Sequence, residues 1–182
     1  MEPQSLEHSG RCEDWIRRDE GYLPRRFSRT VVMLHPGATA TGNREVPFAA
    51  PNPNNVRCDE EVELAFDAAL LDVFPESTPC RYALYGGFAR YPERRRLEEL
   101  GLLRISGRLD YFVGKGPLGS HLFAATDELF GGFLPLAFLW AEDESWFVAS
   151  PPDLDFTAVG CTDQLATRLL DDDALHAFEW SG

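Results

Sequence analysis

The chain has 182 residues, a length that favours a single domain, 1–182, over two. Hydrophobic residues make up 44% and charged residues 26% of the sequence, so a core can form and wholesale disorder is excluded. The formal net charge of -13 disfavours binding to the phosphates of DNA or RNA and to anionic membranes.

The negative charge is concentrated in the C-terminal part of the sequence. Residues 1–57 hold eight Arg and seven Asp or Glu, whereas residues 58–182 have a net charge of -14. After Lys115, Arg168 is the only basic side chain against twelve carboxylates. Such a field steers a basic partner toward itself, although acidity also simply confers solubility. The sequence leaves both interpretations open.

The cysteines and the N-terminus bear on the cellular compartment. Cys12, Cys58, Cys80 and Cys161 are widely separated and show no metal-ligand spacing. Met1 to Gly10 lacks the basic and apolar regions of a signal peptide. We therefore expect a cytoplasmic protein with reduced thiols, no metal, no cofactor and no membrane partner.

Residues 1–57 form the least regular region. A short charged helix is expected over 11–20, and a strand over 27–34, where a bulky apolar run ends before Pro36. Residues 36–55 are rich in Pro, Asn and Gly and predict a long surface loop.

The middle of the chain contains the clearest helical pattern. Apolar residues recur at helical spacing over 59–74, with Asp59 as an N-cap and Pro75 as the stop. Alternation predicts a strand over 80–85. The remaining expected elements here are a helix over 92–100, a strand over 109–113 and a helix over 118–130.

The C-terminal third predicts a hairpin and further elements. Strands over 136–140 and 146–150 flank the acidic connection 141–145. A strand over 156–160, a helix over 162–170 and one more turn reaching Phe178 follow. The whole pattern predicts an α+β fold, with a central, largely antiparallel sheet of about five or six strands and helices packed mainly on one face.

Several segments are candidates for chemistry. The stretch from Val113 to His121 superficially suggests a phosphate loop, but Lys115 and Ser120 are five positions apart, which favours a strand-to-helix turn. The four histidines have no zinc-binding spacing. His35 lies at a strand end, where catalytic side chains occur but a structural role is commoner. Cys161 precedes a helix, a position that can lower a thiol pKa, although a buried thiol is the more common case.

The acidic hairpin is the candidate for partner recognition. Trp140 and Trp146 bracket its carboxylates, and exposed aromatic anchors with an acidic rim are typical of protein-binding patches. Asp153 and Asp155 form a D-x-D pair, for which a solvated strand face is favoured over a cation site. The predicted partner-binding residues are Trp140, Glu142, Asp143, Glu144, Trp146, Asp153 and Asp155.

The blocks Phe138–Ala149 and Asp153–Gly160 contain the segments W-A-E-D-E-S-W-F-V-A, D-L-D and T-A-V-G, and Phe27–Pro36 and Thr78–Cys80 precede them. In this order, and over most of the chain, the sequence resembles a family of actinomycete proteins with no established activity, whose segments are W-P-E-D-R-A-W-x-V-A-T, D-x-D and T-x-V-G-G. This sequence has Ala141 and Glu144 where the family has Pro and Arg, and Cys161 where it has Gly. The resemblance implies an order of elements and no mechanism.

Two function classes follow from these observations. The first is an acidic protein-interaction module, of the immunity or antitoxin kind, whose acidic face masks a basic protein partner. The alternative is a small-molecule enzyme or ligand-binding protein with a pocket near the 36–55 loop that uses His35, Asp153 and Asp155. No catalytic motif supports enzymatic activity, and the sequence does not fix the oligomeric state.

Overall fold

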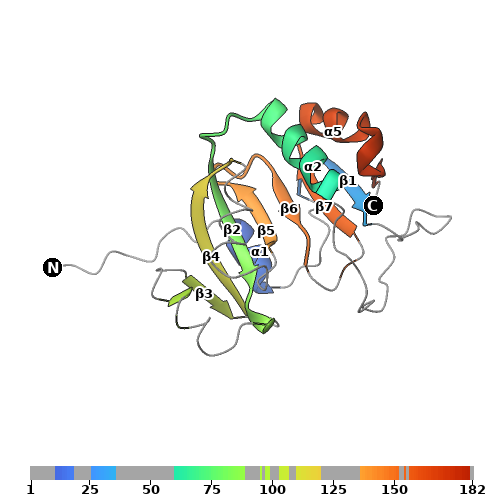
Figure 1. Ribbon diagram of the computed structural model, residues 1–182. Coiled ribbons are helices and arrows are strands. Elements are labelled where there is room, and N and C mark those ends of the chain that lie inside the picture. The colour runs from blue at the N-terminus through green and yellow to red at the C-terminus, as the bar shows by residue number, and fades with distance from the viewer. Residues whose placement is uncertain are drawn as a thin grey trace.

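The fold is built on one antiparallel sheet. The computed structural model describes residues 11–18, 26–35, 60–88, 95, 97–98, 103–106, 110–119, 136–151, 154 and 156–180. Within these residues the sheet has eight strands in the order β3-β4-β2-β5-β6-β7-β1-β8, and every pairing is antiparallel (Figure 1). The strands are β1 (Arg29–Leu34), β2 (Pro79–Tyr85), β3 (Leu103–Ser106), β4 (Asp110–Pro117), β5 (Leu136–Ala141), β6 (Phe147–Ala149), β7 (Phe156–Cys161) and β8 (Ala177–Glu179).

The predicted α+β class and the antiparallel sheet are confirmed, but the strand number is higher than expected. β3 and β8 were not predicted, and β8 replaces the last helical residues expected before Phe178. β4 runs on to Pro117, so the Gly-Lys-Gly segment is a paired strand, in which Lys115 lies opposite Arg81, and not a turn or a phosphate loop.

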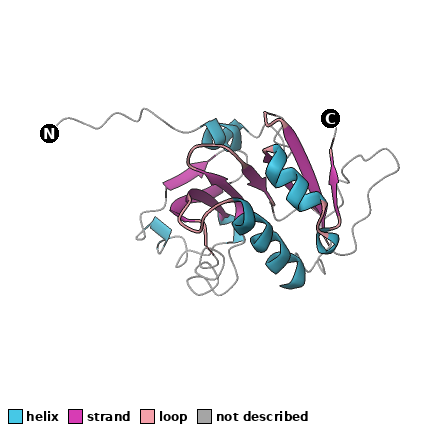
Figure 2. Ribbon diagram, turned by 90° about the horizontal axis from the view of Figure 1, so that it is seen from above, coloured by secondary structure: helices cyan, strands magenta, loops and turns pink. Residues whose placement is uncertain are grey.

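Helices cover both faces of the sheet. The helices are α1 (Arg11–Arg18), α2 (Glu60–Val73) and α5 (Asp163–Leu170), with short 3-10 turns η1 (Gly86–Phe88) and η2 (Asp173–Leu175). α2 and α5 pack on one face over a core that includes Leu70, Leu139 and Leu165. α1 packs on the opposite face, against Phe138 and its neighbours, so two of these three helices lie on one face, as expected (Figure 2).

The first strand lies between two strands from the end of the described chain. β1 pairs with β7 on one side and with β8 on the other, with Val31 opposite both Val159 and Glu179. Arg29 forms a forked ion pair with Glu179, Nε to Oε1 at 2.7 Å and Nη2 to Oε2 at 2.8 Å. This geometry is the stronger, bidentate form of an Arg–carboxylate contact, and it fastens the edge strand β8.

Some expected elements lie outside the described residues. The 36–55 loop and almost all of the expected 118–130 helix are among them. Of the expected 92–100 helix, Arg95, Leu97 and Glu98 are described and have helical backbone. Leu97 is buried against Leu84 and Phe112. None of the helices in the described ranges is long and apolar enough to cross a bilayer.

Candidate functional site

The two tryptophans of the acidic hairpin are core residues. Trp140 is 1% exposed and Trp146 is 0% exposed. Trp140 lies opposite Phe147 in the β5–β6 register, so both face α1, whereas Trp146, one residue earlier, faces α2 and contacts Phe74 at 5.5 Å between ring centroids. The prediction of exposed aromatic anchors at Trp140 and Trp146 is therefore wrong, because the strand pleat directs the two rings into the two cores on opposite faces of the sheet.

Glu144 at the hairpin tip binds α1 and the segment before β1. Its Oε1 accepts a hydrogen bond from the backbone N–H of Cys12 at 3.0 Å, and its Oε2 accepts from Arg26 Nη1 at 3.2 Å. The backbone of Glu144 has a φ of 58°, in the left-handed region that few non-glycine residues adopt. A carboxylate near the start of a helix satisfies an unpaired N–H and matches the helix dipole. Glu144 therefore has a structural role.

The other hairpin carboxylates also have partners inside the chain. Glu142 lies 3.8 Å from Arg81 Nε, and Arg81 also donates a hydrogen bond to the buried carboxylate of Glu13 in α1. Asp143 accepts from the backbone N–H of Ser145 at 3.0 Å. Glu142 and Asp143 are still exposed, so the hairpin contributes two surface carboxylates, one of them beside an arginine.

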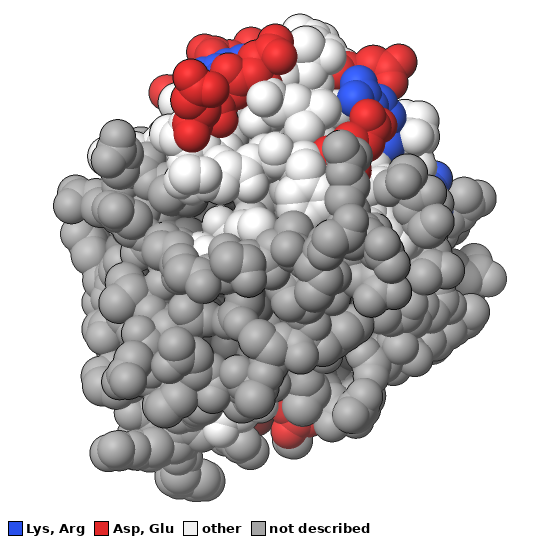
Figure 3. All heavy atoms as spheres, turned by 90° about the vertical axis from the view of Figure 1, so that its right-hand side faces the viewer, with Lys and Arg blue, Asp and Glu red and all other residues white. Residues whose placement is uncertain are grey.

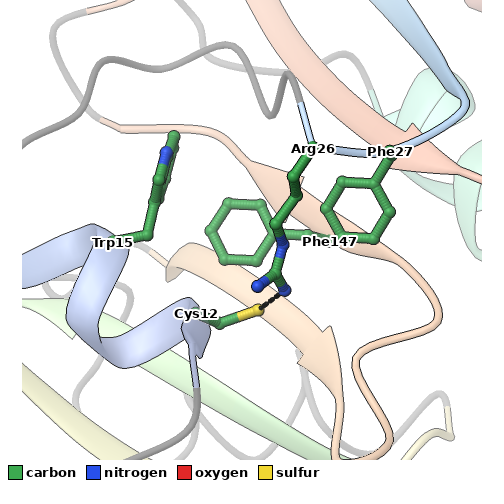
Figure 4. Close-up of a pocket in the computed structure, with 5 residues that line it drawn as sticks. All are labelled: Cys12, Trp15, Arg26, Phe27 and Phe147. Carbon is green, nitrogen blue, oxygen red and sulfur yellow. Dashed lines mark hydrogen bonds between the residues drawn. The ribbon is translucent and has the colours of Figure 1, made fainter.

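A small pocket beside this hairpin is lined in part by Cys12. It is lined by Cys12, Trp15, Arg26, Phe27 and Phe147 and has space for about one water molecule (Figure 4). Arg26 Nη2 donates to the Cys12 sulfur at 2.6 Å. Burial raises the pKa of the Cys12 thiol to about 12 despite the guanidinium. The thiol is therefore protonated at neutral pH and is not an activated nucleophile.

Cys80 and Cys161 are likewise buried, unreactive thiols. Burial is the main cause that raises the pKa of each to about 12. The position of Cys161 before α5, which could have lowered its pKa, is therefore outweighed by burial under the helix layer. All three described cysteines are free.

His35 belongs to a short chain of polar side chains. It is 4% exposed, and its Nε2 lies 2.9 Å from Thr157 Oγ1, which donates to Ser150 Oγ at 2.9 Å. This chain joins the end of β1 to β7 and to the residue after β6. Asp153 and Asp155 lie outside the described residues, so the predicted His35–carboxylate site is not tested. Across the described ranges, no group of three or more His, Cys, Asp or Glu side chains is placed to hold a metal ion.

Within the part of the chain that the structure describes, acidic side chains are most numerous on the helix layer, which sequence reasoning did not single out. The described side chains of α2, α5 and η2, together with the connection between the last two, contain six aspartates and one arginine, a net charge of -5. On the side of the molecule toward which α2 and α5 lie, Asp and Glu side chains form two groups near the top of the face, separated by uncharged atoms and each accompanied by Lys or Arg atoms (Figure 3). The six aspartates of this helix-layer surface are Asp67, Asp72, Asp163, Asp171, Asp172 and Asp173.

Arg168, the arginine within these elements, is held by two of the aspartates, and Asp163 interacts electrostatically with a second arginine, Arg29 of β1. Arg168 Nε donates to Asp72 Oδ2 and Nη1 donates to Asp172 Oδ2, both at 2.8 Å. The hydrogen bond from Arg168 is the main cause that lowers the pKa of the Asp172 carboxyl. Asp163, Asp171 and Asp173 are exposed. Because Arg168 is engaged, it offers little compensation to carboxylates that face solvent.

The comparisons with known proteins add no relative. No protein-family model, curated protein or solved structure matches this chain. The functional argument therefore depends on the sequence and on the geometry described above.

Proposed function

We propose that this protein is an acidic, cytoplasmic interaction module that binds a basic protein partner through the helix-layer surface of α2, α5 and η2. The observation that carries the proposal is the ratio of six aspartates to one arginine among the described side chains of these elements, with the arginine already bonded to Asp72 and Asp172. Clustered carboxylates accelerate association with a cationic partner and repel phosphate backbones.

Other observations are consistent with the cytoplasmic part of the proposal. Free, buried thiols at Cys12, Cys80 and Cys161 suit a reducing compartment. An immunity- or antitoxin-like role, in which an acidic face masks a basic protein, is the form of this function that the charge suggests. The resemblance to the actinomycete family remains a prediction and assigns no activity.

The test compares capture of basic proteins by three forms of the protein. The first is the wild type, the second is Asp171→Asn/Asp173→Asn on the helix layer, and the third is the matched control Glu142→Gln/Asp143→Asn on the hairpin. Each double variant removes two exposed carboxylates. We expect the wild type and the hairpin control to retain the same basic protein from a host extract, with an affinity that falls as salt rises. The helix-layer variant should retain it at least several-fold more weakly. Equal retention by all three forms would contradict the proposal.

A second function, that of a small-molecule enzyme, is favoured by one observation, the His35–Thr157–Ser150 chain. An imidazole joined to two hydroxyls can move a proton, as an enzyme site requires. The 4% exposure of His35 does not favour this function, because a substrate needs access to the site. Loss of a hydrolytic activity in a Ser150→Ala variant, with the fold intact, would support it.

A further inference from the structure

The outward face of α2 exposes one large apolar side chain and, about two turns further on, a carboxylate. Leu64, Ala68 and Asp72 are four residues apart, so they lie along one face of the helix, and all three are exposed. Leu64 is 62% exposed and is the one large hydrophobic residue that stands exposed in the described part of the chain. On the inward face, Ala69 and Leu70 are buried and Phe66 and Val73 are partly buried. Leu64 therefore offers an uncovered apolar contact on the outward face of α2.

The acidic end of this face continues onto the neighbouring elements. Arg168 bonds Asp72 of α2 to Asp172, the residue before η2, and so fixes η2 beside the C-terminal end of α2. Asp171 and Asp173 flank Asp172 and are exposed. A ligand lying along the outward face of α2 therefore meets an apolar side chain first and a set of carboxylates next.

Charge decides which occupant fits. A second copy of this chain would bring another net charge of -13 and place carboxylates against carboxylates. An anionic peptide or nucleic acid is disfavoured for the same reason. A cationic partner gains both contacts, because its basic groups face the aspartates and its apolar groups cover Leu64.

The geometry of the face also indicates the shape of the occupant. α2 has 14 residues and is about 21 Å long. Leu64, Ala68 and Asp72 form an i, i+4 ridge with a small residue at its centre, which permits close approach of a second helix. We propose that the outward face of α2 is the docking surface for an amphipathic, basic helix of the partner protein, with an apolar side chain over Leu64 and Ala68 and Lys or Arg side chains toward Asp72, Asp171 and Asp173. This inference rests on the proposed function and deepens it.

The test uses two synthetic peptides as probes. Each has about 18 residues of the same composition, Leu, Ala and Lys, long enough to cover α2 as a helix. In one peptide the leucines form a single helical stripe, and in the other they are scrambled. We expect the wild type to bind the amphipathic peptide about tenfold more tightly than the scrambled peptide, a preference of about 1.4 kcal/mol.

Two variants assign that preference to the proposed surface. Leu64→Ser should abolish the preference for the amphipathic peptide and leave binding of the scrambled peptide unchanged. Because Leu64 is exposed, the thermal midpoint should not fall. Asp171→Asn/Asp173→Asn should weaken binding of both peptides and flatten the salt dependence. If the aspartate variant weakens binding but Leu64→Ser changes nothing, the helix-docking inference is overturned and the acidic interaction function stands. If the wild type binds neither peptide at low salt, both fail.

Discussion

The backbone N–H of Cys12 and the carboxylate of Glu144 are 132 positions apart in the chain and form a hydrogen bond of 3.0 Å. This contact joins α1, on one face of the sheet, to the tip of the β5–β6 hairpin. It also explains why a glutamate tolerates left-handed backbone at the tip, since the contact offsets part of the conformational cost.

Replacement of Glu144 should separate these two effects. Glu144→Ala loses the carboxylate and keeps the strained backbone, so we expect a loss of about 1–2 kcal/mol in the free energy of unfolding. Glu144→Gly loses the same contacts but relieves the left-handed strain, and it should cost about 1 kcal/mol less than the alanine variant. Urea denaturation measures both, and hydrogen exchange should show faster opening of α1 in each variant. Identical stabilities would contradict the strain argument.

The Glu13–Arg81 ion pair should be costly to break from one side. Glu13 is 2% exposed, so Arg81→Met leaves a buried carboxylate without its guanidinium. We expect Arg81→Met to lower the free energy of unfolding by about 3 kcal/mol. Adding Glu13→Gln to that variant should recover about 1–2 kcal/mol, because the charge that lost its partner is then removed. A double-mutant cycle by chemical denaturation gives the coupling, and purely additive losses would argue against the pair.

Trp146 should behave as a core residue and not as a binding anchor. Trp146→Ala should destabilise the fold by about 3–5 kcal/mol. Trp146→Phe should cost less than about 2 kcal/mol, since the indole N–H has no hydrogen-bond partner among the described residues. Thermal denaturation of the two variants checks the order. A phenylalanine variant as unstable as the alanine variant would indicate that the N–H is bonded.

The buried thiols predict a loss of stability in alkali. Cysteines have an ordinary pKa of about 8.5 in an unfolded chain, and burial raises the pKa of Cys12, Cys80 and Cys161 to about 12 in the folded protein. Above about pH 8.5 the unfolded chain therefore releases protons that the folded chain retains, so the free energy of unfolding falls as the pH rises toward 12. Chemical denaturation between pH 7 and pH 10 measures this decline.

Thiol labelling provides an independent check. In a Cys58→Ser background, which removes the one cysteine outside the described residues, the native protein should react negligibly with a thiol reagent at pH 8. All three remaining thiols should react once guanidinium unfolds the chain. Rapid labelling of one thiol in the native protein would contradict both its burial and its raised pKa.

Patterns in the sequence predicted the elements with strong periodicity. The apolar stripe over 59–74 gave α2, and the two aromatic runs around residue 143 gave the β5–β6 hairpin. β3 and β8 were missed because four and three residues are too short to show alternation. Gly116 and Pro117 predict a turn at what is the end of β4. Pro117 is tolerated there because it is the last residue of the strand, opposite Pro79, the first residue of β2.

The candidate site could be predicted less well than the fold. Two tryptophans beside carboxylates suggested an exposed patch, yet the register that places Trp140 opposite Phe147 sends Trp146 to the other face. That register depends on how the strands pair and not on composition. The helix-layer surface depends on the packing of η2 beside α2. Arg168 links them, because it bonds to Asp72 of α2, about 100 positions away in the chain, and to Asp172 beside η2. The sequence alone predicts only the acidity of each segment.

The position of β1 between β7 and β8 has a consequence for how the protein is made. A ribosome synthesises β1 more than a hundred residues before its two neighbours, and Arg29 precedes its ion-pair partner Glu179 by 150 positions. Until then β1 has both hydrogen-bonding edges open, and an open strand edge pairs readily with other chains. Contacts this distant in sequence also slow folding. Nascent chains should therefore depend on chaperones that shield β1 until residues 156–179 have emerged.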